Sequence, residues 1–339
     1  MSASSTTVFV SGATGFIAQQ TIVQLLQKGY NVVGSVRSTE KGETLAKNLN
    51  NSKFHYAIVK GLSEIGAFDE ALKAHPEVTI FLHTASPVTF AAEDNERDIL
   101  IPAIDGTKNV LASIKKYGPQ IKKVVLTSSI FGSADFGDLA NPDFEGGEDT
   151  WNDPTYEVAK QNGATAYSAS KAFAEKAAWK FLETEKPNFT LAVINPVFVF
   201  GPQAFESSVK SLNETAKLTA QVLDLKPDSA IPDLAGLFVD VRDVAKAHIL
   251  AFELPEAAGK RFVIQNGRFD FQQVLDSFRK QFPELKDQVP VGKPGSSDFS
   301  AFKPLHDNNA RTIFKIDYIS LDKVIKDSIS QILAYKAKN

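Results

Sequence analysis

The sequence predicts an α/β fold: a doubly wound (Rossmann) parallel sheet with a smaller, mainly helical C-terminal lobe. Three observations predict it. Short runs that are apolar throughout alternate with helical patterns over the first half of the chain, as in a parallel sheet covered on both faces. A glycine-containing turn directly follows the first apolar run. Beyond Pro196 the pattern changes and helical segments dominate. Right-handed crossovers between the strands then give the doubly wound arrangement.

The expected strands are the short apolar runs at residues 7–11, 31–36, 54–59, 78–83, 122–127 and 190–194. Helices are expected at residues 17–28, 68–74, 97–116 and 167–183. The segment between the fifth strand and the last of these helices is rich in Gly, Asp, Asn and Pro, so residues 134–162 are expected to form a long surface loop.

The second half is expected to complete the sheet and to form the lobe. Residues 212–223 look helical, residues 239–244 lead into a helix that ends at Phe252, and residues 261–265 form a strand. From Phe269 onward the chain is expected to be mostly helical, with a Pro/Gly/Ser-rich connection at 290–297. We therefore assign residues 1–195 and about 236–265 to the Rossmann domain, and about 196–235 and 266–339 to the smaller lobe.

The composition excludes several classes of function. The chain has 339 residues, a formal net charge of −3 and no cysteine. It therefore lacks an electrostatic footprint for nucleic acid or membrane, and it cannot form disulfides or zinc–thiolate sites. Its five histidines are not paired at metal-ligand spacing. No targeting signal is evident and no apolar run approaches the roughly 20 residues that span a bilayer. We expect a cytoplasmic protein with no nucleic-acid, membrane or metal partner.

The turn after the first strand has the sequence Gly12-Ala-Thr-Gly15-Phe-Ile-Ala. Small residues there allow the backbone to approach a phosphate, and the following helix N-terminus offers unpaired N–H groups and positive potential. The spacing Gly-x-x-Gly-x-x-Ala fits the first strand-to-helix turn of a dinucleotide site, whose last position tolerates Ala. We expect a pyrophosphate to bind at Gly12, Thr14, Gly15, Phe16 and Ile17.

Basic residues follow the second strand. NAD sites usually place a carboxylate here for the 2′-hydroxyl of the adenosine ribose, but this chain has Arg37, with Lys41 close behind. An arginine suits a 2′-phosphate because it can form charge-assisted hydrogen bonds with it. The sequence therefore favours NADPH over NADH as the cofactor.

Polar residues end the fourth and fifth strands at the edge where ligands bind in such sheets. The fifth ends in Thr127-Ser-Ser129, and at least one of these hydroxyls is expected to serve the backbone rather than a ligand. His83 and Thr84 end the fourth, and we interpret His83 as a positioned polar residue rather than a catalytic one. A serine-hydrolase site is excluded because no Gly-x-Ser-x-Gly elbow occurs.

Tyr167 and Lys171 stand four residues apart in a segment that is compatible with a helix, so both side chains lie on one helix face. A neighbouring cation favours the phenolate and is expected to lower the tyrosine pKa from about 10. Such a tyrosine could exchange protons near neutral pH. A Tyr-x-x-x-Lys pair alone also occurs by chance, so its weight comes from the turn, the arginine and the strand-end hydroxyls.

Together these segments resemble the extended short-chain dehydrogenase/reductases, in particular the dihydroflavonol-reductase-like branch. Within that branch they are most similar to the yeast NADPH-dependent methylglyoxal/3-methylbutanal reductases. The resemblance covers nearly the whole chain. It rests on residues 8–12, 15–19, 83–87, 124–129, 171–179, 195–203, 240–248 and 291–296.

The resemblance implies a triad of Ser129, Tyr167 and Lys171. Ser129 would hydrogen-bond the carbonyl oxygen, Tyr167 would deliver a proton, and Lys171 would lower the Tyr167 pKa and hold the nicotinamide ribose. It also implies cofactor contacts from the backbone of Leu62 and from Thr84, Pro196 and Val197.

The resemblance further implies pocket walls formed by Val88, Phe90, Ile130 and Phe131. Two positions depart from the family pattern. Gly61 stands where relatives often have an Asp that contacts the adenine amine. Ile130 stands where they often have a Tyr, which replaces a pocket hydroxyl by an apolar wall and could shift preference toward bulkier or more apolar ketones.

We therefore expect an NADPH-dependent reductase of aldehydes and ketones, including methylglyoxal, 3-methylbutanal and prochiral ketones. It is expected to be a monomer or a weak homodimer with a small carbonyl compound as its partner. A sugar-nucleotide epimerase or dehydratase of the same fold is an alternative, although no arginine cluster for a second pyrophosphate stands out in the C-terminal lobe. A non-catalytic NADP(H)-sensing regulator is a second alternative.

Overall fold

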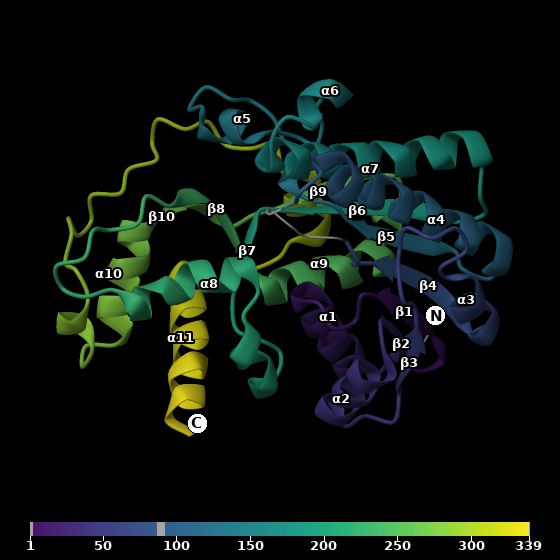
Figure 1. The fold of residues 1–339 in the computed structure, drawn as a ribbon, viewed down its shortest axis with the longest axis horizontal. Helices are drawn as coiled ribbons and strands as arrows, with labels where there is room; N and C mark the ends of the chain where they lie inside the picture. The colour runs from purple at the N-terminus through teal and green to yellow at the C-terminus, as the bar shows by residue number, and fades with distance from the viewer. Residues whose placement is uncertain (1–2, 87–91, 339) are drawn as a thin grey trace.

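The computed structural model describes residues 3–86 and 92–338. Over these residues the centre is a seven-stranded sheet, parallel throughout, in the order β3-β2-β1-β4-β5-β6-β9 (Figure 1). Its strands are β1 (Thr7–Ser11), β2 (Asn31–Val36), β3 (Phe54–Ile58), β4 (Val78–His83), β5 (Lys123–Thr127), β6 (Thr190–Pro196) and β9 (Arg261–Ile264). The strand order reverses between β1 and β4, where doubly wound folds bind ligands at the carboxyl ends. The predicted fold class is confirmed.

Helices cover both faces of this sheet (Figure 1). One face carries α1 (Phe16–Gln27), α2 (Thr39–Leu49) and α9 (Val241–Glu253), and the other carries α3 (Asp69–Ala74), α4 (Ile101–Tyr117) and α7 (Gly163–Glu185). Covered on both sides, β1 buries Val8, Phe9 and Val10 completely. This double burial explains why the strands are apolar throughout and show no apolar–polar alternation.

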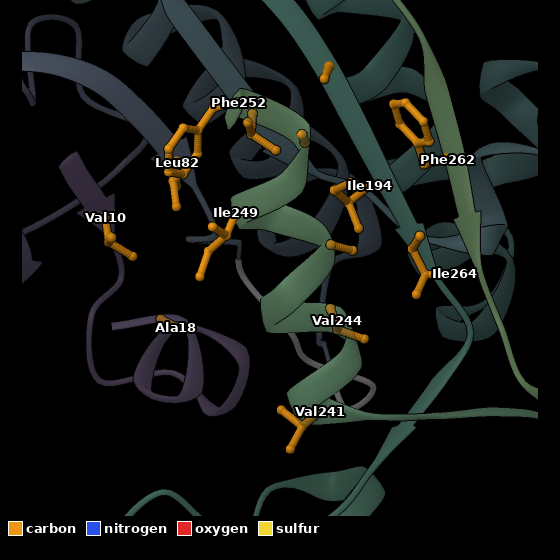
Figure 2. Packing of buried hydrophobic residues seen from close by; sticks show 14 of the residues in the cluster. Val10, Ala18, Leu82, Ile194, Val241, Val244, Ile249, Phe252, Phe262 and Ile264 are labelled. Carbon is orange, nitrogen blue, oxygen red and sulfur yellow. The ribbon is translucent and has the colours of Figure 1, made fainter. Parts of the chain in front are cut away.

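Helix α9 packs against α1 and against strands of both sheets in the molecule. Val241, Val244 and Ile249 project from α9 into a cluster that includes Val10 of β1 and Ile194 of β6 (Figure 2). Each of these side chains is buried, and complete burial of a Val or Ile side chain contributes about 1.5–3 kcal/mol. The cluster therefore fixes α9, and with it the strand that precedes it, against the main sheet.

A second, three-stranded sheet forms the smaller lobe together with three helices. The strands, in the order β10-β8-β7, are β10 (Gly267–Asp270), β8 (Ala235–Asp240) and β7 (Phe198–Phe200), and the helices are α8 (Glu214–Ala220), α10 (Phe271–Gln281) and α11 (Leu321–Lys338). Fully buried Phe200 and Phe269 meet edge to face at 4.9 Å in its core. Helices make up most of the regular structure of this lobe, and its sheet is an addition that the sequence did not indicate. The domain boundaries stay a prediction. The predicted return to the Rossmann domain at about residue 236 falls within β8, and β8 pairs with strands of the second sheet.

Several helix predictions differ from the structure. The helix expected over 97–116 is a π-helical turn, Glu96–Leu100, followed by α4, whose second residue, Pro102, has no N–H to donate. The loop expected over 134–162 contains the short helices α5 (Phe136–Ala140) and α6 (Tyr156–Ala159).

The segment between α10 and α11 is mostly irregular rather than helical. Its prolines interrupt helical hydrogen bonding, and the chain crosses back toward α5, where His306 forms a bridge with Gly147 (Figure 1). In the part of the chain that the structure describes, no helix is both long and apolar enough to cross a bilayer. Nor do its His, Asp and Glu side chains form a group that could hold a metal ion.

Candidate active site

A cavity of about 790 Å³ opens where the carboxyl ends of β5 and β6 face the second sheet. The predicted site residues that line it are Gly15, Phe16, Ile17, Thr84, Ser129, Ile130, Phe131, Tyr167, Lys171, Pro196 and Val197. Those that do not line it are Gly12, Thr14, Arg37, Lys41 and Leu62. Val88 and Phe90 lie outside the described residues. The structure therefore brings the predicted triad together in one cavity.

Tyr167 and Lys171 lie one turn apart on α7. The helix starts early enough to include both because the side chain of Asn162 caps it, accepting the N–H of Thr165 at 2.9 Å. The Lys171 ammonium is 5.1 Å from the centre of the Tyr167 ring and donates a hydrogen bond to Ser86 Oγ at 2.7 Å. The phenol and the ammonium thus share one environment, as their spacing predicts.

Burial sets the proton equilibria of both groups. It lowers the pKa of Lys171 to about 8 and raises the pKa of Tyr167 to about 12. In each case the charged form is disfavoured because it leaves water. The expected lowering of the Tyr167 pKa by the lysine is therefore wrong for this structure: desolvation of the phenolate outweighs the attraction of the nearby cation. Tyr167 is a protonated acid at neutral pH.

The three strand-end hydroxyls have different partners. Thr127 Oγ1 lies 2.6 Å from Nε2 of His248, and Ser128 Oγ donates to Glu175 Oε2 at 2.7 Å. Ser129 Oγ accepts a backbone N–H at 3.3 Å, and its own proton has no acceptor among the described residues. The hydroxyls of Thr127 and Ser128 are therefore structural, and the prediction was that at least one of the three would be. The Ser129 hydroxyl can donate a hydrogen bond to a ligand in the cavity.

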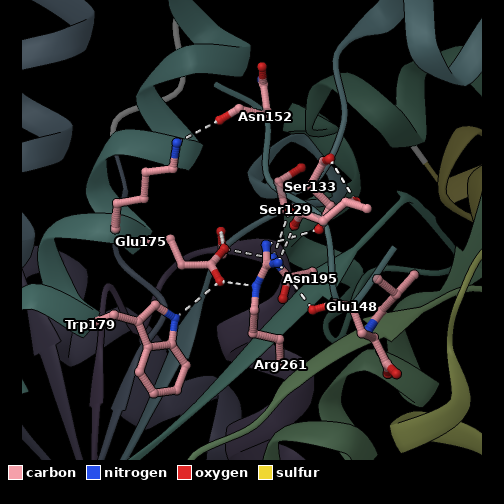
Figure 3. Close-up of polar contacts among 12 residues, drawn as sticks. Ser129, Ser133, Glu148, Asn152, Glu175, Trp179, Asn195 and Arg261 are labelled. Atoms are coloured by element: carbon pink, nitrogen blue, oxygen red, sulfur yellow. Dashed lines mark hydrogen bonds and ion pairs between the residues drawn. The ribbon is translucent and has the colours of Figure 1, made fainter. Parts of the chain in front are cut away.

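A buried carboxylate lies behind Ser129 (Figure 3). Glu175, two turns beyond Tyr167 on α7, has no solvent exposure. It accepts hydrogen bonds from Ser128 Oγ, Asn195 Nδ2, Arg261 Nε and Trp179 Nε1. Asn195 Nδ2 also donates to the carbonyl of Ser129 at 2.9 Å. A Cβ at Gly132 would lie 2.3 Å from Glu175 Oε2, so only glycine allows the turn after Ser129 to approach this carboxylate.

Arg261 of β9 neutralises Glu175 and ties the strand to the long loop. Its Nε lies 2.6 Å from Glu175 Oε1, and its other nitrogens donate to Ser133 Oγ and to the carbonyls of Glu148 and Thr150. Its guanidinium carbon lies 3.9 Å from the centre of the Trp151 ring. The network therefore connects β9, α7 and the turn that carries Ser129.

His83 has the positioning role that the sequence indicates. Ser11 Oγ accepts the N–H groups of Thr84 and Ala85, each at 3.1 Å, so its proton is directed to His83 Nδ1 at 2.9 Å. We therefore assign the imidazole proton to Nε2. Burial, with the charge of Lys171, lowers the pKa of His83 to about 4 and keeps the ring neutral.

The glycine turn after β1 is shaped to receive an anion. Gly12 has a φ of +65°, which disfavours a side chain, and a Cβ there would lie 3.0 Å from Ala85. Gly15 is the N-cap of α1 and has no side chain to cap it. The first N–H groups of α1 are therefore available at the positive end of the helix.

Arg37 and Lys41 are exposed at the carboxyl end of β2 and in the first turn of α2. Neither forms an ion pair with any residue that the structure describes. Leu62 packs against Gly106 of α4 and, with Lys171, lines a separate small pocket. The two cations lie beside the glycine turn because β1 and β2 are adjacent parallel strands.

Aromatic and aliphatic side chains form the wall of the cavity beside Tyr167. The Phe131 ring meets the Tyr167 ring edge to face at 5.9 Å, and its centre is 4.4 Å from that of Phe136 in α5. Ile130 is buried next to Phe131. The predicted apolar wall is present in the described part of the cavity.

Sequence reasoning missed other residues at the site. Glu175 could have been found, because it continues the four-residue spacing of Tyr167 and Lys171 on one helix face. Ser86, which accepts from Lys171, and Arg268 of β10, which lines the cavity, carry no signal in spacing or composition. Their positions depend on how distant segments meet.

The fold and the site define the class of protein. The chain belongs to the NAD dependent epimerase/dehydratase family, whose profile matches residues 8–265. This match, with the relatives below, confirms the resemblance to extended short-chain dehydrogenase/reductases.

The chain is similar over nearly its whole length to proteins that are named as reductases. A Candida albicans protein, provisionally named NADPH-dependent methylglyoxal reductase GRP2, is 51% identical over 338 residues, covering 97% of this chain and 99% of that protein. The Saccharomyces cerevisiae NADPH-dependent methylglyoxal reductase GRE2 is 42% identical over 339 residues, covering 98% and 99%. The crystal structure of yeast methylglyoxal/isovaleraldehyde reductase Gre2 complexed with NADPH matches with a TM-score of 0.94 at 42% identity, covering 98% of this chain and 100% of that chain.

Proposed function

We propose that this chain is an NADPH-dependent carbonyl reductase that converts aldehydes and ketones into alcohols. The observation that carries the proposal is the single cavity in which Ser129, Tyr167 and Lys171 meet apolar walls beside the N-terminus of α1. The names of the relatives support it, since the Saccharomyces cerevisiae protein is a methylglyoxal reductase whose crystal structure contains NADPH.

The residues present fit NADPH. The backbone turn at Gly12 and Gly15, with the uncapped start of α1, would hold the pyrophosphate. Arg37 and Lys41 would hold the 2′-phosphate, because both are exposed cations without a carboxylate partner among the described residues. The backbone of Leu62 would lie near the adenine. Thr84, Pro196 and Val197 would lie beside the nicotinamide, which supplies the hydride when the cofactor is bound.

Tyr167 would donate its phenolic proton to the carbonyl oxygen. A tyrosine with a pKa of about 12 holds this proton at neutral pH, as a general acid for reduction must. Ser129 would donate a second hydrogen bond to the same oxygen and stabilise its developing negative charge. The phenolate that remains would be stabilised by the Lys171 charge, 5.1 Å from the ring centre.

Lys171 has a further role in orienting the site. Its hydrogen bond to Ser86 holds the ammonium between α7 and the segment after β4. Near neutral pH a lysine with a pKa of about 8 is still mainly charged. It can therefore assist Tyr167 and also bind a ribose hydroxyl.

The walls at Ile130 and Phe131 suit substrates with an apolar group next to the carbonyl. The proposed substrates are 2-oxoaldehydes such as methylglyoxal, 3-methylbutanal and prochiral ketones. Ser129 and Tyr167 would orient the carbonyl by hydrogen bonds, and the apolar walls would hold the rest of the substrate by packing.

The test is NADPH oxidation, followed by cofactor absorbance, with methylglyoxal, 3-methylbutanal and a prochiral aryl ketone. Chiral analysis of the alcohol product accompanies it. We expect turnover with NADPH and one preferred enantiomer. Turnover of sugar nucleotides without these activities would support the epimerase or dehydratase alternative, and tight NADPH binding with no turnover of any substrate would support the sensor alternative.

The compartment and the oligomeric state are also proposals. We propose that the protein acts in the cytoplasm as a monomer or weak homodimer, with small carbonyl compounds as its partners. Size-exclusion chromatography with light scattering across a concentration series tests the oligomeric state. A stable tetramer at low micromolar concentration would contradict it.

A further inference from the structure

We propose that Arg268 selects carbonyl substrates that carry a carboxylate at the end remote from the reacting carbonyl. The inference rests on the proposed reductase function and adds a substrate class to it. It concerns the part of the cavity that is lined by α5 and the segment before α11, away from the glycine turn.

The guanidinium of Arg268 lies at the cavity wall. Its central carbon is 3.7 Å from the centre of the Phe302 ring, and one terminal nitrogen donates to the carbonyl of Leu139 at 3.1 Å. Both Phe302 and Leu139 line the same cavity as Arg268. These contacts hold the planar group in place while its remaining N–H groups have no partner among the described residues.

The charge of Arg268 is not balanced. Among the described residues that line the cavity, the charged ones are Lys171, Glu214 and Arg268. Glu214 pairs with Lys217 at 2.6 Å, and Lys171 belongs to the reacting end through Ser86 and Tyr167. Arg268 has no carboxylate partner in the described chain. Partly buried arginines are normally paired, because taking the charge from water costs free energy.

Burial also lowers the pKa of Arg268, which reports the same uncompensated loss of hydration. A ligand carboxylate would offset that loss with two parallel N–H···O bonds to the guanidinium. The fixed plane above Phe302 would favour this geometry, since little side-chain freedom remains to be lost on binding.

An apolar wall separates Arg268 from the reacting groups. It runs from the Tyr167 ring to Phe131 at 5.9 Å and on to Phe136 at 4.4 Å. Phe136 begins α5, and Leu139 of the same short helix accepts the bond from Arg268. A ligand that reaches both ends therefore needs an apolar spacer, and a flat aryl group suits the aromatic walls.

The reaction itself is unchanged. A hydride from NADPH adds to the carbonyl carbon, the carbonyl oxygen takes the proton of Tyr167, and the products are NADP⁺ and an alcohol. The distal carboxylate keeps its charge and bonds throughout. Arg268 is therefore a specificity residue whose contribution depends on the substrate's charge.

The test compares 4-formylbenzoate with methyl 4-formylbenzoate, using NADPH, in the wild-type protein and in Arg268→Leu. The ratio of kcat/KM for the acid to kcat/KM for the ester is the readout. Differences in intrinsic reactivity and general damage to the protein cancel when this ratio is compared between proteins. We expect the ratio to fall at least about tenfold in Arg268→Leu, the lower range for a charge-assisted hydrogen bond. Arg279→Leu in α10, away from the cavity lining, is the matched control and should leave it unchanged.

A binding measurement supplies a readout that does not need turnover. Calorimetry on the NADP⁺-loaded proteins measures the dissociation constants of 4-(hydroxymethyl)benzoate and its methyl ester. The acid should lose about tenfold in affinity relative to the ester in Arg268→Leu, and Arg268→Lys should retain part of the preference. Equal acid-to-ester ratios in wild type and Arg268→Leu would overturn the inference. If benzaldehyde is reduced, the reductase proposal survives that result; if no aldehyde is reduced, the reductase proposal itself fails.

Discussion

The Lys171 ammonium lies 5.1 Å from the centre of the Tyr167 ring and 2.7 Å from the Ser86 hydroxyl. The lysine thus stands over the phenol and forms no ion pair with a carboxylate among the described residues. Its charge is available to stabilise a phenolate at the moment when Tyr167 gives up its proton. The arrangement has a cost in stability, because the charge is buried.

That cost predicts that Lys171→Met stabilises the cofactor-free protein. Burial lowers the pKa of Lys171 from its ordinary value of 10.5 to about 8. Between these values the unfolded chain binds a proton that the folded protein does not, so stability rises with pH in this window. Below pH 8 the buried charge lowers the stability of the wild-type protein by its full amount, about 3 kcal/mol. The variant regains this free energy but loses the hydrogen bond to Ser86, which is worth about 1 kcal/mol. Urea unfolding at pH 7 should show the variant more stable by about 2 kcal/mol.

The advantage of Lys171→Met should shrink as pH rises from 8 toward 10.5. Lys326→Met, at an exposed position of α11, is the control and should give a difference from wild type that does not change with pH. A variant that is less stable than wild type at pH 7, or whose advantage persists at pH 10, would contradict the buried-charge explanation.

Arg37→Asp should change the choice of cofactor. Loss of a charge-assisted hydrogen bond to the 2′-phosphate costs about 1.5–3 kcal/mol, and the new carboxylate adds repulsion. The ratio of kcat/KM for NADPH to that for NADH should therefore fall by at least about tenfold. Lys47→Asp makes the same charge change at the end of α2 and should preserve the ratio. An unchanged ratio in Arg37→Asp would exclude the proposed contact.

The neighbouring serines at the end of β5 should respond differently to alanine. Ser129→Ala removes a donor to the carbonyl oxygen and should lower kcat by about 100-fold, with little change in unfolding free energy. Ser128→Ala leaves Glu175 without one of its donors and should cost about 1–3 kcal/mol of stability. Steady-state kinetics and urea unfolding on both variants check the contrast. Similar kinetic losses in the two would mean that Ser129 is not the donor.

The buried Glu175–Arg261 pair should be far more important for stability than a surface pair. Glu175→Gln leaves the Arg261 guanidinium without its counter-charge, which costs about 3–5 kcal/mol. Glu183→Gln on the same helix removes a pair whose side chains are 66% and 71% exposed, and it should cost less than about 1 kcal/mol. Equal urea midpoints for the two variants would show that the network is not a stabilising element.

Much of this molecule could be predicted from local patterns. Mostly apolar runs of five or six residues identified β1, β2 and β4 to the residue, because a strand buried on both faces is apolar at most of its positions. The sequence also predicted that the glycine turn and the polar strand ends lie together, since parallel strands bring their carboxyl ends to one edge of the sheet.

The second sheet, the Tyr167 pKa and the position of Arg268 depend on contacts between distant segments, which local sequence patterns do not predict. β7, β8 and β10 are short and find their partners across long stretches of chain. Burial raises the pKa of Tyr167, which packs edge to face against Phe131, and the Tyr-x-x-x-Lys spacing carries no information about that burial. Arg268 reaches the cavity only because β10 lies beside β8 in the second sheet.

The central claim is that Tyr167 delivers the proton in carbonyl reduction. The most direct measurement is kcat for methylglyoxal with Tyr167→Phe, together with the NADPH dissociation constant of the same protein. Removal of the hydroxyl deletes the acid but preserves the ring that contacts Phe131, so kcat should fall by at least about 100-fold while NADPH affinity stays nearly unchanged. Near wild-type turnover by Tyr167→Phe would contradict the claim.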